Sequence, residues 1–330
     1  MVFIFFSYNF VLTIFFSKFK KKFKILDKPS KKKIHKKTGY LIGGIFIFLN
    51  LMILLSLNEV LSLELFKDYE QIQKNKILFF TTGSILFLIG LFDDKFSLNP
   101  YVRLILLFLT IFAFLNLANE FIIHMIYFES LKLFFNLNDF SLIFTLISII
   151  LLIQIFNFFD GIDLQLSLYV IFLSFYLFIV SKSLILLAII LIMIFNLYLN
   201  SFQKIFLGDA GVYLITFILS IFIIVNYNQS KINSEEVFLM LLIPFLDFVR
   251  LFFIRICEKK NPMIGDLKHI HHLIIKKIGL YKTLLIIGLL YMLPLLMYVY
   301  LHNFFTSISL GAIGMYSATI YYFTKNNKIT

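Results

Sequence analysis

Long apolar runs separated by short polar segments dominate this chain of 330 residues. An apolar run of roughly 17 to 25 residues has the length that a helix needs to cross a bilayer. Only Ser181, Lys182 and Ser183 interrupt the stretch from 164 to 199, so counts of ten and eleven both stay open. The pattern predicts an all-α polytopic membrane protein with about 10–11 transmembrane helices joined by catalytic loops. The expected spans are 2–17, 40–58, 77–92, 101–118, 139–156, 164–181, 183–199, 211–227, 236–254, 283–301 and 304–323.

The composition agrees with this class, because 61% of the residues are hydrophobic and 44 are Phe, more than a soluble core could bury. No linker or polar block divides the chain, so residues 1–330 are predicted to form a single membrane domain. The first run lacks a preceding basic stretch and a small-residue cleavage pattern, which favours a true span over a signal peptide. Cys257 is the only cysteine, so an internal disulfide is excluded.

Basic residues are distributed unequally between the two sides of the predicted topology. With eleven alternating spans, 24 of the 30 Lys and Arg residues lie nearest to loops on one side. By the positive-inside rule this side faces the cytoplasm. A general compositional bias towards Lys could explain the net charge of +12 but not the sidedness of the lysines, and we expect no nucleic-acid partner.

Four polar patches fall on this same side of the membrane. Acids and imidazoles are costly beside hydrocarbon, so a chain that keeps several of them there is expected to use them. Placement on a shared side favours one reaction centre over a permeation path. The patches are GLFDDKFSLNPYVR at 90–103, NFFDGID at 157–163, FLGDAG at 206–211 and DLKHIHH at 266–272.

The acids of these patches suggest a metal ion. Asp93 and Asp94 follow an apolar run directly, Asp160 and Asp163 are predicted to lie one helical turn apart, and Asp209 stands between two glycines. Crowded carboxylates repel one another in a low-dielectric setting, which implies a divalent cation or a basic ligand. Oxygen-only ligands favour Mg²⁺, with Mn²⁺ as the second choice. For any single Asp, capping of the next helix remains the simpler interpretation.

The histidines are a second group of candidates. His269 and His272 are spaced i, i+3 and are predicted to share a helix face with Asp266, while His271 points elsewhere. Zinc is disfavoured, because no HExxH pattern or cysteine pair accompanies them. Imidazoles that donate to a phosphate and imidazoles in a solvated loop are both open interpretations.

Arginine occurs only at positions 103, 250 and 255, which makes each occurrence informative. Its planar fork binds phosphate or carboxylate in a bidentate manner that Lys cannot match. For Arg250 an ordinary salt bridge with Asp247, one helical turn away, is an equally good interpretation.

The lysine-rich segment DKPSKKKIHKKTGYLIGG, at 27–44, precedes the second span. Its simplest role is orientation and contact with anionic lipid, while Lys33 and His35 are candidates for phosphate binding. Gly43 and Gly44 would allow a neighbouring helix to approach closely.

Taken in order, these motifs resemble the polyprenyl-phosphate N-acetylhexosamine-1-phosphate transferases, also known as glycosyltransferase family 4. The similarity extends from Asp27 to His272, and HIHH at 269–272 is similar to the undecaprenyl-phosphate N-acetylglucosamine-1-phosphate branch. Leu164 departs from the family pattern, in which Gly usually follows the second Asp of the DGxD segment. Tyr40 likewise stands where Pro is usual.

The resemblance also implies roles for individual residues. Asp93 and Asp94 match the catalytic acid pair near the lipid phosphate, Asp209 matches the magnesium ligand, and Phe206 matches an aromatic that stacks on uracil. Asp247 and Asp266 match polar positions that lead up to the histidines. The implied substrate-binding residues are Lys33, His35, Asn157, Asp160, Asp163, Phe206, Arg255, His269, His271 and His272.

The implied reaction is transfer of N-acetylhexosamine 1-phosphate from a UDP-sugar, first of all UDP-GlcNAc, to undecaprenyl or another polyprenyl phosphate. It would start cell-envelope glycan synthesis, such as O-antigen or teichoic acid, at the cytoplasmic face of a bacterial inner membrane. UDP-linked FucNAc, QuiNAc or MurNAc-pentapeptide are alternative donors, and a homodimer is left open. A CDP-alcohol phosphatidyltransferase is disfavoured because DGIDLQ lacks the Ala-Arg pair of that class. A cation-coupled transporter is the alternative from another class.

Overall fold

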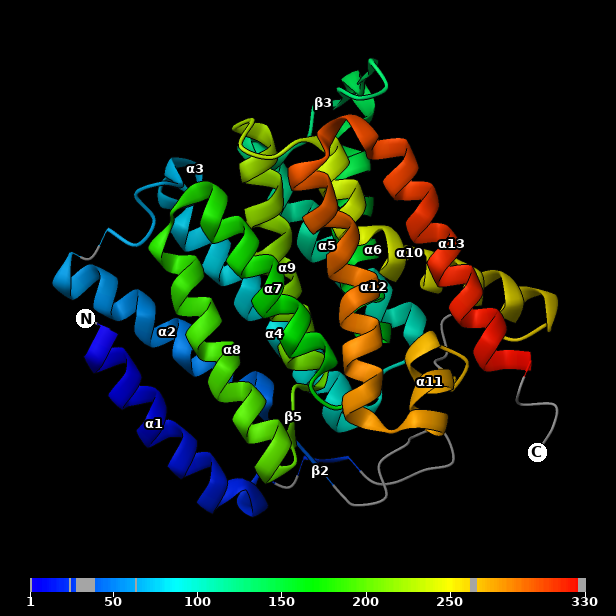
Figure 1. The fold of residues 1–330 in the computed structure, drawn as a ribbon. Coiled ribbons are helices and arrows are strands. Elements are labelled where there is room, and N and C mark those ends of the chain that lie inside the picture. Colours follow the sequence, from blue (N-terminus) through cyan, green and yellow to red (C-terminus); the bar gives the residue numbers. More distant parts are fainter. Residues whose placement is uncertain (1, 24, 28–38, 63, 262–265, 326–330) are drawn as a thin grey trace.

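The computed structural model describes residues 2–23, 25–27, 39–62, 64–261 and 266–325. Each of the eleven expected spans coincides with a long helix (Figure 1). Among the described residues, eight of these helices are long and apolar enough to cross a membrane, and α7 is a shorter apolar helix. The prediction of an all-α polytopic membrane protein is therefore confirmed. The helices are α1 (Val2–Phe19), α2 (Gly43–Leu61), α4 (Lys76–Phe96), α5 (Pro100–Leu117), α6 (Ser141–Phe159), α7 (Gln165–Ser181), α8 (Leu184–Gln203), α9 (Gly208–Asn228), α10 (Ser234–Cys257), α12 (Leu280–Tyr300) and α13 (Phe305–Lys325).

The boundary between α7 and α8 resolves the question left by the apolar pattern. Lys182 adopts a left-handed conformation, with φ of 60°, and Ser183 is extended before α8 begins. A left-handed residue stops a helix because it cannot continue the right-handed path. The sixth and seventh apolar runs are therefore separate helices.

Several short elements accompany the long helices. They include α3 (Glu70–Lys74), α11 (Ile270–Ile278) and 3₁₀ turns at Lys20–Lys22, Asn119–Phe121, Asn138–Phe140 and His302–Phe304. Five short strands were not expected from the sequence: β1 (Leu26–Asp27), β2 (Gly39–Leu41), β3 (Met125–Phe128), β4 (Leu133–Asn136) and β5 (Ile205–Phe206).

The strands form two small sheets at opposite ends of the bundle. In the first, β2 lies in the middle, antiparallel to β1 and parallel to β5, with Tyr40 opposite Ile205. The second is the antiparallel hairpin of β3 and β4. Figure 1 shows β2, β5 and α11 at the lower end and β3 at the upper end. The lower end carries the four polar patches.

Helix α9 is the centre of the bundle, because almost all of its residues are buried. A helix that is apolar on every side suits such a position. Its first turn is held between two glycines. A Cβ on Gly44 of α2 would lie 2.4 Å from the backbone nitrogen of Gly211, and one on Gly90 of α4 would lie 2.5 Å from Cα of Ala210. The predicted close approach at Gly44 is thus confirmed, and it fixes the position of neighbouring Asp209.

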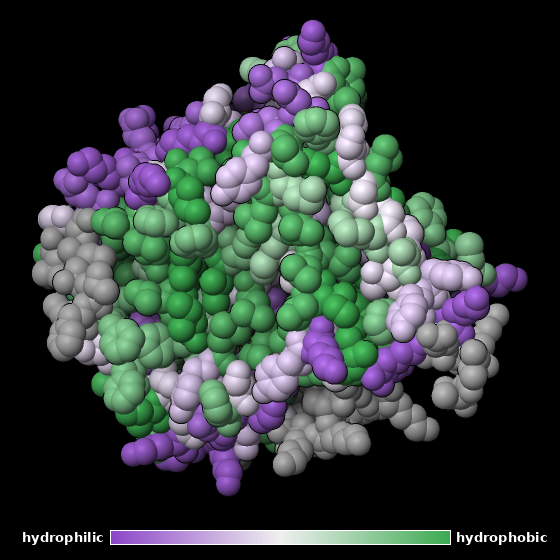
Figure 2. All heavy atoms as spheres, in the orientation of Figure 1, coloured by the Kyte–Doolittle hydropathy of each residue, from purple (hydrophilic) through white to green (hydrophobic). Residues whose placement is uncertain are grey.

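The outer surface is apolar around the waist of the molecule. Figure 2 shows a broad hydrophobic band, with hydrophilic residues gathered towards two opposite ends. Large apolar side chains of the long helices are exposed, among them Ile105 and Leu109 of α5 and Leu285 of α12. An exposed apolar belt of this extent is the surface that a bilayer covers.

Candidate active site

The end of α4 and the start of α9 are joined through the carboxylate of Asp94. Its two oxygens accept hydrogen bonds from the backbone N–H groups of Asp209, at 2.8 Å, and Ala210, at 3.1 Å. Gly208 has a φ of +69°, and a Cβ on it would lie 2.5 Å from Asp94 Oδ2. Asp94 therefore caps the N-terminus of α9 from a neighbouring helix and satisfies donors that the helix itself cannot.

The Asp93 carboxylate makes a different set of contacts. Arg103 Nη1 donates to Asp93 Oδ2 at 2.8 Å and lies 3.9 Å from Asp209 Oδ2. The hydroxyl of Tyr213 donates to Asp93 at 3.3 Å, and the Asn157 amide donates to Asp209 Oδ1 at 2.6 Å. Residues from three of the four motifs therefore meet at one point, as the sequence predicts.

The segment after α6 is a turn. The prediction that Asp160 and Asp163 lie one helical turn apart is wrong, because α6 ends at Phe159 and the next helix begins only at Gln165. Lys204 Nζ lies 3.3 Å from an oxygen of Asp163. Burial, together with the charges of Asp209 and Asp163, raises the pKa of Asp160 well above its usual value.

The three histidines form one cluster, which corrects a second prediction. Helix α11 begins only at Ile270, so His269 precedes it and does not share a helical face with His272. The chain turns just before, where the N–H of Lys268 donates to Asp266 Oδ1 at 2.8 Å. The His271 ring does not point away: its centroid lies 5.3 Å from that of His269 and 4.2 Å from that of His272.

This cluster packs directly on the turn after α6. A Cβ on Gly161 would lie 2.2 Å from His271 Nε2, so glycine is required for the contact. Burial, followed by the neighbouring imidazoles, holds the pKa of His271 well below its usual value. Burial and the charges of His269 and Lys276 lower the pKa of His272 to about 3. Both ring nitrogens of His271 are buried, and neither has a hydrogen-bond partner among the described residues, so the imidazole is neutral with its polar atoms unsatisfied.

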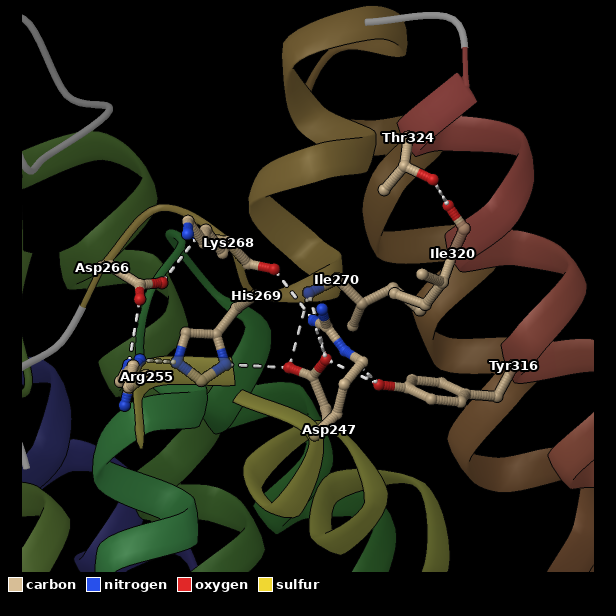
Figure 3. Close-up of polar contacts among 10 residues, drawn as sticks. Asp247, Arg255, Asp266, Lys268, His269, Ile270, Tyr316, Ile320 and Thr324 are labelled. Carbon is tan, nitrogen blue, oxygen red and sulfur yellow. Dashed lines mark hydrogen bonds and ion pairs between the residues drawn. The ribbon is translucent and has the colours of Figure 1, made fainter. Parts of the chain in front are cut away.

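Asp247 holds His269 in place (Figure 3). Asp247 Oδ2 lies 2.8 Å from His269 Nδ1, while Oδ1 accepts hydrogen bonds from Arg250 at 2.8 Å and from the hydroxyl of Tyr316 at 2.9 Å. The salt bridge of Asp247 and Arg250 is thus confirmed. A carboxylate with this many partners fixes the orientation of the ring that it contacts.

Arg255 approaches the same imidazole from its other side. It donates to Asp266 Oδ2 at 2.9 Å and lies 3.3 Å from His269 Nε2. The Arg255 and Lys268 N–H groups outweigh burial and hold the pKa of Asp266 below its usual value. His269 is therefore clamped between Asp247 and Arg255, which makes it a positioned group.

The remaining predicted residues lie at the edge of the site or outside the described part. Phe206 is buried in β5, where its ring packs so closely on Gly39 that a Cβ there would lie 1.9 Å from a ring atom. Lys33 and His35 lie outside the described residues.

Other residues of the site differ in how clearly the sequence marks them. Arg103 stands out through the scarcity of arginine, although its partner Asp93 could not be named. Phe158 was missed: its ring centroid lies 5.7 Å from that of His269 and 5.1 Å from the Arg255 guanidinium carbon. Among 44 Phe residues nothing marks it. Tyr213 and Tyr316 were also missed, because nothing distinguishes them among the 17 Tyr residues.

The acid cluster fits a magnesium ion that shares its coordination with a substrate. The carboxylates of Asp93 and Asp209 both face Nη1 of Arg103, and the atoms that they offer to a metal ion are oxygens. No group of three or more His, Cys, Asp or Glu with metal-binding geometry occurs in the part of the chain that the structure describes. Mg²⁺ commonly binds through one or two carboxylates and completes its shell with water and phosphate oxygens. The donor set suits that mode of binding.

Fold and site together define a polytopic membrane protein with an acid and histidine centre at one end of its helices. Residues 76–227 match the family described as glycosyl transferase family 4. A Thermotoga maritima protein named undecaprenyl-phosphate alpha-N-acetylglucosaminyl 1-phosphate transferase is 32% identical over 285 residues, covering 84% of this chain and 82% of the relative.

Proteins of the same name from other bacteria are also similar in sequence to this chain. The Escherichia coli K12 protein is 28% identical over 286 residues, covering 80% of this chain and 73% of its own. The Yersinia pestis protein is 27% identical over 277 residues, covering 76% and 70%. The chain belongs to glycosyl transferase family 4.

Proposed function

We propose that this protein transfers N-acetylglucosamine 1-phosphate from UDP-GlcNAc to undecaprenyl phosphate. The observation that carries the proposal is the meeting of Asp93, Asp209, Asn157 and the histidine cluster at one end of a lipid-facing bundle. The relatives that carry this activity in their names cover most of the chain. The excess of basic residues at this end supports a cytoplasmic site in a bacterial inner membrane.

In the proposed reaction an oxygen of the lipid phosphate attacks the β-phosphorus of UDP-GlcNAc. The bond from the β-phosphorus to the bridging oxygen breaks, and UMP leaves with that oxygen. The new phosphorus–oxygen bond gives polyprenyl-diphospho-GlcNAc, which would start a cell-envelope glycan. A phosphate monoester is mostly dianionic at neutral pH, so positioning and charge are the main demands on the protein.

The residues of the site divide these tasks between them. Asp209, with Asp93 beside it, would hold Mg²⁺, which when bound offsets negative charge on the diphosphate. Arg103 orients Asp93, and Asp94 fixes the first turn of α9 and thereby Asp209. The neutral His271 imidazole, buried against Gly161 with both ring nitrogens unpartnered among the described residues, would donate a hydrogen bond to the sugar nucleotide once binding separates it from Gly161.

A direct assay tests the proposal. Purified protein is incubated with UDP-GlcNAc, undecaprenyl phosphate and Mg²⁺, and UMP and the lipid product are quantified. Asp209→Asn should abolish turnover, whereas Asp139→Asn, at an exposed acid before α6, should behave as wild type. Release of no UMP with any of several UDP-sugars would refute the proposal. Substrate flux into proteoliposomes without UMP would indicate a transporter.

A further inference from the structure

The antiparallel hairpin of β3 and β4 has no polar face, although it lies outside the long helices. Seven of the eight residues in its ladder are apolar or aromatic, and the eighth is Asn136. An antiparallel sheet beside water commonly turns one polar face towards the solvent. Charged side chains occur only in the turn between the strands, at Glu129 and Lys132. The hairpin therefore differs from an ordinary solvated loop.

Only one strand of the hairpin packs against the helices. The ring centroid of Phe128 in β3 lies 6.3 Å from that of Phe238 in α10 and 6.1 Å from that of Phe305 in α13. All four residues of β4 are exposed, among them Phe134 at 59% and Phe135 at 50%. Successive residues of a strand point to opposite faces, so these two rings extend from both faces of the hairpin.

Hydrogen bonds to the helices hold the hairpin in this position. The Tyr227 hydroxyl of α9 donates to the C=O of Met125 at 3.0 Å and accepts from the N–H of Tyr127 at 3.3 Å. In the turn, the N–H of Ser130 donates to Oε1 of Glu235, a buried residue of α10, at 2.7 Å. The hairpin is fixed both along β3 and at its turn, so the exposed rings of β4 stay directed away from the helices.

The exposed surface of the hairpin continues the apolar surface of the long helices. Phe238, which meets Phe128, is itself 38% exposed, and Leu301 and Phe304 between α12 and α13 are also exposed. Figure 1 shows β3 near the upper ends of α12 and α13, and Figure 2 shows hydrophobic side chains that reach this end of the molecule. The medium that covers the hydrophobic band would therefore cover the hairpin as well.

The backbone of β4 limits the depth at which a bilayer can hold the hairpin. β4 pairs with β3 on one side, and no further strand lies beside it in the part of the chain that the structure describes. Unpaired backbone groups are not tolerated in the hydrocarbon core, whereas water and headgroups can satisfy them at the interface. Tyrosine, which β3 carries at position 127, is also enriched at this depth. The hairpin is thus suited to the boundary between headgroups and acyl chains.

We propose that residues 125–136 form an interfacial anchor in the phospholipid leaflet that lies farther from the candidate active site. The ladder side chains contact the upper part of the acyl chains, and Glu129 and Lys132 reach the headgroups. A protein partner would cover one face of the hairpin, whereas both faces are apolar. Pairing of β4 with β4 of a second copy would satisfy its free edge but leave both faces uncovered. The inference concerns membrane contact alone and does not depend on the proposed reaction.

The absence of Trp from the chain permits a direct test by fluorescence. Phe134→Trp places a single probe on β4, and the protein is reconstituted in phosphatidylcholine with bromine either near the headgroup or near the end of the acyl chains. Phe108→Trp, at an exposed position in the middle of α5, is the control for the bilayer core. Lys67→Trp, at an exposed position between α2 and α3, is the control for water. Met125→Trp, on the same face of the ladder, replaces Phe134→Trp if that variant does not fold.

We expect bromine near the headgroup to remove at least about half of the Phe134→Trp emission, because interfacial elements bury their apolar side chains about 5–10 Å into this boundary. Bromine near the chain ends should quench this probe less, and the order should be reversed in Phe108→Trp. Lys67→Trp should respond weakly to both lipids and strongly to aqueous acrylamide. Weak quenching of Phe134→Trp by both lipids would overturn the proposal, whether acrylamide reaches the probe or a protein shields it. Stronger quenching from the chain ends would overturn the interfacial depth.

Thiol chemistry tests the alternative of a second copy. Cys257 is the only cysteine, so Cys257→Ser combined with Phe134→Cys leaves one thiol, which lies on the hairpin. In membranes this thiol should react more slowly with a membrane-impermeant maleimide than the thiol of Cys257→Ser combined with Lys67→Cys. Mild oxidation should give no disulfide-linked dimer. Equal labelling of the two variants, or efficient formation of the dimer through position 134, would overturn the proposal.

Discussion

The two neighbouring aspartates at the end of α4 are expected to differ in what they do. Asp94→Ala removes the acceptor of two backbone N–H groups, those of Asp209 and Ala210. Hydrogen bonds to a charged group contribute about 1.5–3 kcal/mol each, but helix caps lose only about 0.5–2 kcal/mol on substitution by Ala. Relief of repulsion from Asp93 and Asp209 offsets part of the loss. We expect a net destabilisation of about 2 kcal/mol.

This loss is measurable as a fall in the apparent Tm of the detergent-solubilised protein. One kcal/mol corresponds to about 2–4 °C in domains of 150–250 residues, so Asp94→Ala should lower the apparent Tm by about 5 °C. Asp94→Asn keeps one acceptor oxygen and should lose about half as much. UMP release should fall strongly in both variants, because Asp209 then loses its fixed position.

A pair of glycine variants isolates the same contact. Gly208 and Gly279 both have positive φ, at +69° and +78°, but a Cβ would meet the Asp94 carboxylate only at Gly208. Gly208→Ala should therefore lower the apparent Tm and the turnover beyond the backbone strain seen in Gly279→Ala. An unchanged or raised Tm in Asp94→Ala with loss of turnover would refute the capping role. Equal effects of the two glycine variants would also contradict it.

Two further predictions concern Arg103 and His272. Arg103→Lys should reduce kcat at least about tenfold, because an ammonium group cannot reproduce the planar fork that lies between Asp93 and Asp209. Lys204→Gln breaks only an exposed ion pair with Asp163 and should change the free energy of unfolding by less than about 1 kcal/mol. Equal activity of Arg103→Lys and wild type would exclude this role. The pKa of His272 is about 3 in the folded protein and 6.5 in the unfolded chain. As the pH drops below 6.5, the unfolded chain binds a proton at His272 that the folded protein does not bind, so the folded protein becomes less stable. The loss should reach about 2 kcal/mol at pH 5. The apparent Tm between pH 8 and pH 5 should fall less in His272→Gln, and an unchanged slope would contradict the prediction.

The helices could be predicted from the sequence because bilayer crossing requires long apolar runs. The start of α9 could not: we expected 211, but the helix begins at Gly208. Its first turn is stabilised by Asp94, which is more than a hundred residues away in the chain. Strands of two to four residues are too short to show an alternating pattern, and β2 pairs with a strand from the other half of the molecule.

The residue types of the candidate site could be predicted from the sequence, but their arrangement in space could be predicted less well. Residues of three motifs, Asp93, Asn157 and Asp209, do meet, which their shared side of the membrane indicated. The arrangement of the histidines was wrong, because the i, i+3 spacing has meaning only inside a helix and α11 begins after His269. The aromatic contacts of Phe158 depend on packing among many similar side chains, which local sequence does not encode.

Because Tyr316 donates a hydrogen bond to Asp247, the order in which the helices are synthesised determines when the histidine cluster is complete. Tyr316 belongs to α13, whereas Asp247 belongs to α10, so the network around His269 draws on a helix that leaves the ribosome well after its other members. A nascent chain that has inserted every helix up to α12 still lacks this contact. Completion of the network around His269 is thereby coupled to translation and insertion of α13.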